Sequence, residues 1–370
     1  MRIDKFKVED WFNKYEKGCR YDLADTCVES LSLNELLNIA KEKQIPQEIL
    51  TKKLNYGDIH GSERLKNAIR TLYKYQSNEN ITITHGAIGA NYLVISSIVN
   101  KGDKVVSVIP TYQQHYSIPK SFGADTTVIY LKEENNWLPD LDELEKAVST
   151  NTKLICLNNP NNPTGALIPD EMLRQIVQIA QKSNAYILCD EVYRGLNHNN
   201  NPFSESIADI YEKGISTSSV SKVFSLAGLR LGWIAAEKSI IDLINSQREY
   251  SIISVGILDD YFSALAIENK DKIIKRNLEK IKAGKKALLD WAENEKHIKI
   301  VPPCAGTTCF AKYDKNLSSY DLCKKLLDDT GVLLLPGETM EMDKYVRIGY
   351  GNNISDLKTA LNIFSDWLKN

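Results

Sequence analysis

From residue 81 to residue 236, short apolar runs alternate with helical segments, and this alternation is the strongest constraint on the fold. Apolar strands of this length, separated by helices, are typical of a mainly parallel sheet that is covered on both faces. The sequence therefore predicts an α/β protein with a mainly parallel sheet in its large unit. The predicted strands are 81–84, 104–109, 126–131, 153–158, 185–189, 215–218 and 232–236, and the predicted helices are 8–15, 32–43, 62–72, 86–100, 141–148 and 169–182.

A different pattern follows residue 240. Long polar helices are predicted at 238–248 and 260–295, and the short mixed elements after them indicate a small α+β unit. A chain of 370 residues also exceeds the size at which single cores usually stop growing. We predict a large domain at 50–250 and a small domain at 1–49 and 251–370 that includes an N-terminal lid segment. The predicted strands of the small unit are 298–301, 307–312, 332–335 and 345–348, and its helices are 320–329 and 354–368.

The composition excludes several classes of protein. The net charge of −2, with both signs interspersed, offers no electrostatic basis for binding nucleic acid or an anionic membrane. The seven cysteines include no C-x-x-C pair, so we expect reduced thiols and neither a disulfide framework nor a metal site. The N-terminus lacks the apolar core of a signal peptide, and no apolar run is long enough to span a membrane. These features predict a soluble, cytoplasmic protein.

Polar and glycine residues follow almost every predicted strand. In open parallel sheets, ligands bind beyond the carboxyl ends of the strands, so these groups are expected to share one site. Each group also has a structural alternative, because Asn and Pro dominate turns, Asp caps helices and Tyr packs in cores. The combination favours a site over a coincidence. In strand order, the groups are Gly86, Ala87 and Ile88, then Tyr112, then Asn162, then Asp190 and Tyr193, then Ser219 and Lys222.

The stretch around Lys222 indicates the kind of ligand. A lysine among small hydroxylated residues can lose its proton and form a Schiff base with an aldehyde. Hydroxyl groups and Arg230, eight residues later, suit a phosphate, which favours several fixed donors and a bidentate cation. An aldehyde that carries a phosphate suggests pyridoxal 5'-phosphate (PLP). The alternative for these residues alone is a Ser-rich turn with a solvated lysine.

The chain resembles the class I/II aminotransferases, which are fold-type I PLP enzymes of the aspartate aminotransferase superfamily. The resemblance covers nearly the whole chain and is strongest from 56 to 233. Together the motifs are specific for the superfamily and much less so for the reaction. The matching motifs are Asn159-Pro160-Asn161-Asn162-Pro163-Thr164-Gly165, Asp190-Glu191-Val192-Tyr193, Ser219-Val220-Ser221-Lys222 and Gly228-Leu229-Arg230-Leu231-Gly232-Trp233.

The resemblance implies catalytic roles for three residues and cofactor contacts for the others. Lys222 would carry PLP as a Schiff base and then move the proton, and Asp190 would pair with the pyridinium nitrogen so that the ring acts as an electron sink. Tyr193 and Asn162 would hydrogen-bond the phenolic oxygen of the ring. The remaining contacts would be Tyr112 on the ring face, and the Gly86-Ala87-Ile88 helix start, Ser219 and Arg230 on the phosphate.

Two further residues acquire roles from the resemblance. Arg347 follows Pro336-Gly337 as the family's carboxylate-binding arginine does, and it would clamp the α-carboxylate of an amino acid, with Asn162 beside it. A surface arginine at a strand end is the alternative. Tyr56 would reach the phosphate of the neighbouring subunit's cofactor, which implies a homodimer with shared active sites.

The N-terminal lid departs from the family pattern. Residues 22–30 contain neither the glycine nor the proline that this segment usually has. Asp25, Thr26 and Glu29 either face the substrate, where an acidic pocket would favour a basic amino acid, or belong to a lid with different packing, which we favour. The region 8–12, this lid and the ending around Arg347 are weakly similar to capreomycidine synthase. We assign no role to His60 or His115.

Three functions are compatible with these residues. The first is transfer of the amino group of an L-α-amino acid to a 2-oxo acid. The second is PLP-dependent elimination or cyclisation of an amino acid, as in a C–S lyase or a capreomycidine synthase-like enzyme, since the first steps are shared. The third, a ligand-sensing domain of a transcription regulator, is disfavoured because the fifty-five residues before Tyr56 are not markedly basic.

Overall fold

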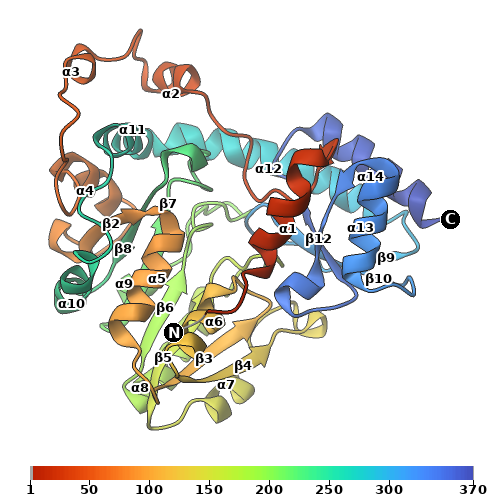
Figure 1. The fold of residues 1–370 in the computed structure, drawn as a ribbon, viewed down its shortest axis with the longest axis horizontal. Helices are drawn as coiled ribbons and strands as arrows, with labels where there is room; N and C mark the ends of the chain where they lie inside the picture. Colours follow the sequence, from red (N-terminus) through yellow and green to blue (C-terminus); the bar gives the residue numbers. More distant parts are fainter. Residues whose placement is uncertain (1–2, 370) are drawn as a thin grey trace.

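A seven-stranded sheet forms the centre of the larger of two units (Figure 1). The computed structural model describes residues 3–369, and its large sheet has the order β2-β8-β7-β6-β5-β3-β4. The five strands from β4 to β7 run parallel, while β8 pairs antiparallel with both β2 and β7. The predicted mainly parallel sheet is confirmed. The strands are β2 (Ile81–His85), β3 (Lys104–Ile109), β4 (Asp125–Tyr130), β5 (Thr152–Asn158), β6 (Tyr186–Asp190), β7 (Gly214–Ser219) and β8 (Leu231–Ala235).

Helices cover both faces of this sheet. Along β5, Leu154 and Cys156 pack into one core, and Ile155 and Leu157 pack into a second core on the opposite face. This arrangement explains why central strands such as β5 and β6 carry continuous apolar runs rather than an alternating pattern. Each fully buried Leu or Ile stabilises the fold by roughly 1.5–3 kcal/mol. One face carries α5 (Gly86–Ile98), α6 (Gln114–Ser121) and α10 (Lys238–Arg248), and the other carries α7 (Leu141–Ala147), α8 (Asp170–Ser183) and α9 (Ile207–Ile210).

The smaller unit is built on an antiparallel sheet of order β12-β13-β10-β9. The N-terminal segment belongs to it in space, because β1 pairs parallel with β11. Its strands are β1 (Tyr21–Asp22), β9 (Ile298–Ile300), β10 (Thr308–Tyr313), β11 (Val332–Leu333), β12 (Leu335–Pro336) and β13 (Tyr345–Gly349). Its helices are α12 (Lys270–Ala292), α13 (Ser319–Thr330) and α14 (Ile354–Leu368).

The N-terminal helix α1 (Lys7–Tyr15) touches both units. The Lys7 backbone N–H donates to Gln113 Oε1 of the large unit (2.8 Å), and Lys7 Nζ lies 2.7 Å from the Glu341 carboxylate of the small unit. Figure 1 shows α1 beside β12 and α13, at the boundary between the units. Trp11 anchors this helix, since its side chain is buried.

Helices α2 (Leu33–Ala40), α3 (Gln47–Leu50), α4 (Glu63–Arg70) and α11 (Ile257–Glu268) complete the fold. The predicted caps are present, because Ser32 and Glu35 form a capping box and Ser62 accepts from the Leu65 N–H. Helix α11 packs against α4, on the side of the large unit. Short 3₁₀ turns are η1 (Glu16–Gly18), η2 (Asn78–Asn80), η3 (Glu133–Asn135), η4 (Ala227–Leu229) and η5 (Gly337–Met340).

Some predicted elements were wrong in detail. The single helix predicted at 260–295 is interrupted at Asn269, which separates α11 from α12. The single strand predicted at 332–335 divides into β11 and β12, which belong to different sheets. Helix α6 was not predicted, because its buried Gln114, His115 and Ser117 hide the apolar periodicity that marks a helix.

The structure also bears on the excluded classes of protein. Within residues 3–369, no helix has both the length and the apolar character that crossing a membrane requires. In the same range, no three or more His, Cys, Asp and Glu side chains come together in a way that could hold a metal ion. All seven cysteines are free thiols.

Candidate active site

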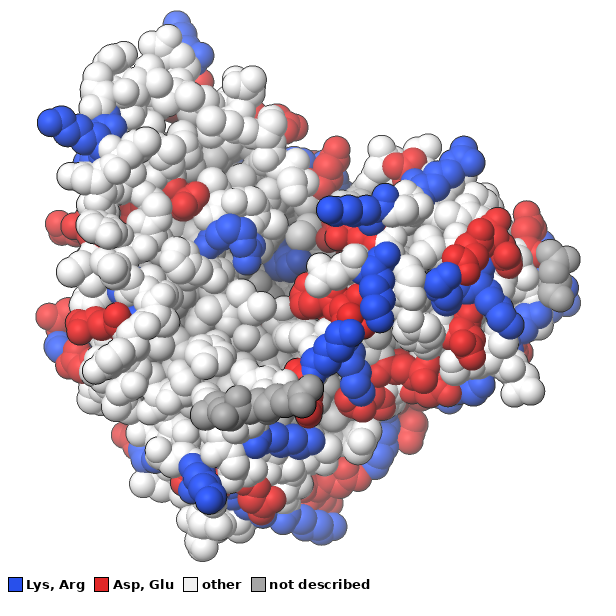
Figure 2. All heavy atoms as spheres, in the orientation of Figure 1, with Lys and Arg blue, Asp and Glu red and all other residues white. Residues whose placement is uncertain are grey.

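A cavity of 430 Å³ lies at the carboxyl ends of β5, β6 and β7, where α1 and β13 close its far side. Its volume is within the range of small-molecule sites. In Figure 2 the surface is hollowed between the large unit and the lobe that carries α13 and α14. The structure thus brings together ten of the twelve site residues predicted from the sequence. These are Ala87, Ile88, Tyr112, Asn162, Asp190, Tyr193, Ser219, Lys222, Arg230 and Arg347.

The first corner of the cavity is the N-terminus of α5. Gly86 has a φ of +68°, which a residue with a side chain rarely adopts, and a Cβ there would lie 3.0 Å from Arg230 Nη2. A Cβ on Gly232 would lie 2.3 Å from the Gly86 carbonyl carbon. The two glycines therefore let the start of α5, β8 and the Arg230 guanidinium approach one another. Free backbone N–H groups and the helix dipole make this corner suitable for a phosphate.

Asp190 forms the buried floor, with 4% of its surface exposed. Its Oδ2 accepts from Asn91 Nδ2 (2.8 Å), and its Oδ1 accepts from the Val192 backbone N–H (3.1 Å). Thr217 in turn donates to Asn91 Oδ1 (2.6 Å). Burial raises the pKa of Asp190 to about 6, even though the two donors oppose this rise. A cationic ring nitrogen placed here would stabilise the charged carboxylate.

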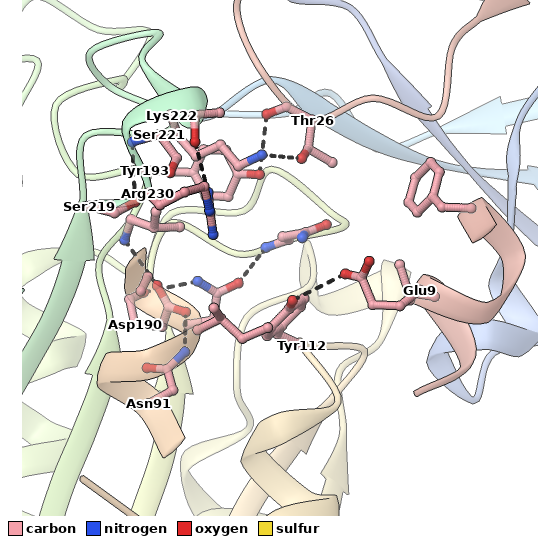
Figure 3. Close-up of a pocket in the computed structure, with 18 of the residues that line it drawn as sticks. Glu9, Thr26, Asn91, Tyr112, Asp190, Tyr193, Ser219, Ser221, Lys222 and Arg230 are labelled. Carbon is pink, nitrogen blue, oxygen red and sulfur yellow. Dashed lines mark hydrogen bonds between the residues drawn. The ribbon is translucent and has the colours of Figure 1, made fainter. Parts of the chain in front are cut away.

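Lys222 extends from the segment after β7 towards the lid (Figure 3). Its Nζ donates to Thr26 Oγ1 at 2.6 Å and to Cys27 Sγ at 3.1 Å. Burial lowers the pKa of Lys222, but Tyr193, Cys27 and Asp25 outweigh it and hold the pKa above its ordinary value. The protein's own side chains thus favour the charged amine, and loss of its proton depends on the chemistry of what binds beside it.

Arg347 lies on β13 at the opposite side of the cavity and is only 2% exposed. Its Nη1 donates to Asn162 Oδ1 (3.1 Å) and its Nη2 to the Ala24 carbonyl (2.7 Å). Its Nε is buried and has no hydrogen-bond partner. The guanidinium carbon lies 6.0 Å from the centre of the Phe12 ring. A buried guanidinium with an unpaired donor is suited to bind an anion such as a carboxylate.

Tyr112 borders the cavity between these two sides. Its ring lies 5.0 Å from that of Phe6, centroid to centroid, and its hydroxyl donates to Glu9 Oε1 at 3.4 Å. Burial raises the pKa of Tyr112, and the Glu9 and Asp190 carboxylates add to this rise. The tyrosine is therefore neutral and available for ring contacts.

Two predicted residues do not line the cavity. Gly86 lies behind the phosphate corner and shapes it, as described above. Tyr56 is 78% exposed, so within one chain it has no contact with the site. Neither His115, which is buried in α6, nor His60 lines the cavity.

The lid residues have separate environments. Thr26 lines the cavity, but Asp25 accepts from the Cys27 backbone N–H (3.0 Å) and from Asn352 Nδ2 (2.8 Å). Burial opposes ionisation of Asp25, yet Lys222 and these donors outweigh it and lower its pKa. Glu29 pairs with Lys280 on the surface. These contacts agree with a lid of different packing rather than with an acidic patch made by this segment.

Sequence reasoning missed several lining residues. Asn91 lies one helical turn after Ala87, so the spacing along α5 could have placed it on the same face. Ser221 lies next to Lys222 in a motif that was already identified. Other missed lining residues carry no local signal, because they come from α1 and reach the site only through the tertiary fold. They are Val8, Glu9 and Phe12.

The residues present fit PLP. The phosphate corner offers backbone donors, a hydroxyl and a guanidinium, the floor offers a carboxylate for a ring nitrogen, and a lysine amine lies in the same cavity. The glycines at 86 and 232 allow the start of α5 and the Arg230 guanidinium to come close together at that corner, where both can serve one phosphate.

Comparison with known proteins supports the same assignment. Residues 29–364 match the family model of aminotransferase class I and II. A PLP-dependent aminotransferase from Streptococcus suis 89-1591 is 39% identical, with a TM-score of 0.96 over 100% of this chain and 98% of its own. Capreomycidine synthase from Streptomyces vinaceus is 28% identical over 98% of this chain and 93% of its own length. Aspartate aminotransferase from Pyrococcus horikoshii is 31% identical over 77% of this chain and 74% of its own length. The chain therefore belongs to the class I and II aminotransferases, and it is a fold-type I, PLP-dependent enzyme.

Proposed function

We propose that the protein is a transaminase that moves the amino group of an L-α-amino acid to a 2-oxo acid in two half-reactions. The observation that carries this proposal is that Lys222, Asp190 and Arg347 line one cavity. A lysine to move a proton and an arginine to hold a carboxylate are the two groups that amino-acid transamination requires of the protein. The family and the 39% identity to the Streptococcus suis aminotransferase support it.

The cofactor would be held mainly by the large unit. The N–H groups at the start of α5, Ser219 and Arg230 would bind the phosphate, while Asp190 would hold the ring nitrogen. When bound, PLP supplies an electron-withdrawing ring that stabilises negative charge at the substrate Cα. Asn162 and Tyr193 would donate to the phenolic oxygen of the ring.

Other residues would bind the substrate and transfer its Cα proton. Arg347 would bind the α-carboxylate with two parallel N–H bonds and so orient the Cα–H bond. The Lys222 amine would take the proton from the substrate Cα as a general base and then deliver it, as a general acid, to C4', the former aldehyde carbon of the cofactor. Thr26 and Cys27, which accept from Lys222 Nζ, would guide the amine between these positions.

A second candidate is elimination or cyclisation of an amino acid. The similarity to capreomycidine synthase over 98% of this chain favours it, as does a lid without glycine or proline. Loss of the Cα proton is common to both reactions, so the same residues serve either. The two differ in where the proton goes next, which only the products can distinguish.

We also propose a homodimer. Large apolar side chains are exposed on the segment around α3, where exposed charged side chains such as Lys52 and Lys53 stand between them. A partner covering this segment would bury Tyr56 and could bring it to a second active site. The exposed residues there are Leu50, Leu54, Tyr56 and Ile59.

The visible spectrum of the purified enzyme, titrated with common amino acids and arginine derivatives, tests the proposed reaction. Transamination predicts conversion of the cofactor to its pyridoxamine form with a stoichiometric 2-oxo acid. Release of ammonia or a cyclised product without the pyridoxamine form would instead establish the second candidate. Lys222→Ala is the control, and loss of its amine should reduce either reaction by roughly 10⁴-fold.

A further inference from the structure

Glu9 points its carboxylate into the active-site cavity from α1. The same face of the helix contributes Val8 and Phe12 to the lining, and Figure 3 shows Glu9 across from Tyr112. Within residues 3–369, the Tyr112 hydroxyl is its one hydrogen-bond partner, at 3.4 Å. A carboxylate accepts about four hydrogen bonds, so most of its capacity is free for a ligand.

The fold holds Glu9 in this place. Gln113 receives the Lys7 N–H on its Oε1 (2.8 Å) and donates through its Nε2 to the Lys5 carbonyl (2.9 Å). Trp11, two residues further along α1, is buried. These contacts fix the first turn of α1 at the mouth of the cavity, so the tertiary structure places the Glu9 backbone there, and the exposed Glu9 side chain lines the cavity.

The neighbouring acid, Asp10, provides an internal comparison. It pairs with Lys5 (2.5 Å) and Lys14 (2.8 Å), and it lies outside the cavity. Either acid in the first turn favours the helix through its dipole, so this effect does not explain why one of them faces the site. Among residues 3–369, Glu9 has no ion-pair partner of its own.

The charges that line the cavity leave one group unused. Under the proposed function, Lys222, Asp190 and Arg230 serve the cofactor and Arg347 serves the α-carboxylate. Among the described lining residues, Glu9 is the remaining charged side chain. A substrate with a second carboxylate would therefore meet an anion and find no uncommitted cation.

We propose that Glu9 binds a cationic group at the end of the substrate side chain, so that the enzyme acts on an L-amino acid with a basic side chain. This inference rests on the proposed function for the position of the α-carboxylate at Arg347. A primary amine and a guanidinium share the required chemistry, because each forms charge-assisted hydrogen bonds to a carboxylate. Acidic residues of 22–30 were considered from the sequence as a source of preference for a basic amino acid. In this proposal the acidic residue that gives that preference is Glu9 on α1.

The test compares substrates that differ in charge but little in shape, namely arginine with citrulline and ornithine with norvaline. For the wild-type holoenzyme, kcat/KM should be higher for the charged member of at least one pair. A preference for arginine over citrulline would identify a guanidinium as the bound group, and a preference for ornithine over norvaline would identify an amine. Glu9→Gln should reduce kcat/KM for that charged substrate by about 10–100-fold and change the neutral one by less than about 3-fold. Glu9→Lys should shift the preference towards glutamate.

Asp10→Asn is the matched control, since it removes a carboxylate from the same helical turn outside the cavity. In both substrate pairs it should leave the ratio of kcat/KM for the charged member to kcat/KM for the neutral member unchanged. Equal kcat/KM for both members of each pair in the wild type would overturn the inference, and transamination would still stand. If no amino acid yields a 2-oxo acid, spectral titration of the holoenzyme gives affinities instead. Weaker binding of the charged substrate by Glu9→Gln would then support the inference while the proposed function fails.

Discussion

The two sides of the cavity are built in different ways. One side, which we call the cofactor wall, follows the ends of neighbouring strands in a single sheet (Figure 3). The other side, the substrate wall, is assembled from a helix, a loop and a strand that lie far apart in the sequence. The cofactor wall consists of Ala87, Ile88, Asn91, Asp190, Ser219, Lys222 and Arg230. The substrate wall consists of Val8, Glu9, Phe12, Thr26 and Arg347.

The difference shows which constraints act on each side. The cofactor wall must satisfy fixed chemistry on a rigid sheet edge, so short motifs with set spacings encode it. Under the proposed function, the substrate wall would contact a ligand that can differ between enzymes, and α1 and the lid contribute no strand to the large sheet. If this separation is real, variants of one wall should leave the function of the other nearly intact.

The largest effect that tests the separation comes from exchanging the two arginines, one in each wall, for glutamine. Arg347→Gln removes a buried guanidinium from the substrate wall and should lower kcat/KM by roughly 10²-fold or more, with PLP affinity unchanged. Arg230→Gln removes an exposed guanidinium beside Gly86 and should weaken PLP binding by roughly 10-fold. Steady-state kinetics at saturating PLP and equilibrium PLP titration measure the two effects.

The comparison fails if the effects are not separable. An increase in KM for Arg230→Gln as large as that for Arg347→Gln, at saturating PLP, would mean that both arginines handle the substrate. Loss of PLP affinity in Arg347→Gln would mean that the small unit also carries the cofactor.

A smaller effect concerns the stability of the cofactor wall without its cofactor. The folded state raises the pKa of Asp190 from 3.8 to about 6, so it favours the protonated carboxyl. This stabilisation is fully present below pH 3.8 and is lost as the pH rises through about 6, with a total of up to about 3 kcal/mol. The free energy of unfolding of the cofactor-free wild type should therefore fall over this window relative to that of Asp190→Asn. Denaturant unfolding at pH 5 and pH 8 covers the upper part of this window and should show roughly 1 kcal/mol of the loss.

Adding PLP should reverse this trend in the wild type, because a cationic ring nitrogen favours the charged carboxylate. Equal pH dependence of the two cofactor-free proteins would show that Asp190 is not forced towards its neutral form. The control Asp10→Asn should follow the wild type.

Much of the fold was predictable because its elements carry local signals. Strands such as β5, β6 and β8 carry apolar runs, and caps such as Ser32 and Ser62 mark helix starts. Prediction failed where tertiary packing decides the outcome. The break at Asn269 and the split after Leu333 interrupt segments whose local pattern is continuous, and buried polar groups conceal α6.

The same division holds for the candidate site. The motifs indicated most of the residues that line the cofactor wall, such as Lys222 and Asp190, because each lies at or just beyond the end of a strand, but they did not indicate Asn91. The contacts of these residues with a cofactor stay predictions. In the substrate wall, only Arg347 was assigned a role from its motif, and Thr26 was considered as one alternative. Glu9 and Phe12 lie on an ordinary amphipathic helix, and the local pattern does not show that this face meets a cavity lined mainly by residues between 87 and 347.

The smallest effect sharpens the comparison within the cofactor wall. Asn91, which the motifs did not indicate, donates to Asp190 Oδ2 and lowers its pKa. Asn91→Ala should therefore raise the pKa of Asp190 further, move its pH-dependent loss of stability to higher pH and weaken PLP binding by roughly 10-fold. Thr217→Val, which removes only the hydroxyl that donates to Asn91, should give a smaller change in the same direction. If Asn91→Ala instead altered KM for the amino acid and left the pH dependence unchanged, Asn91 would act on the substrate, and the cofactor wall would not be a self-contained unit.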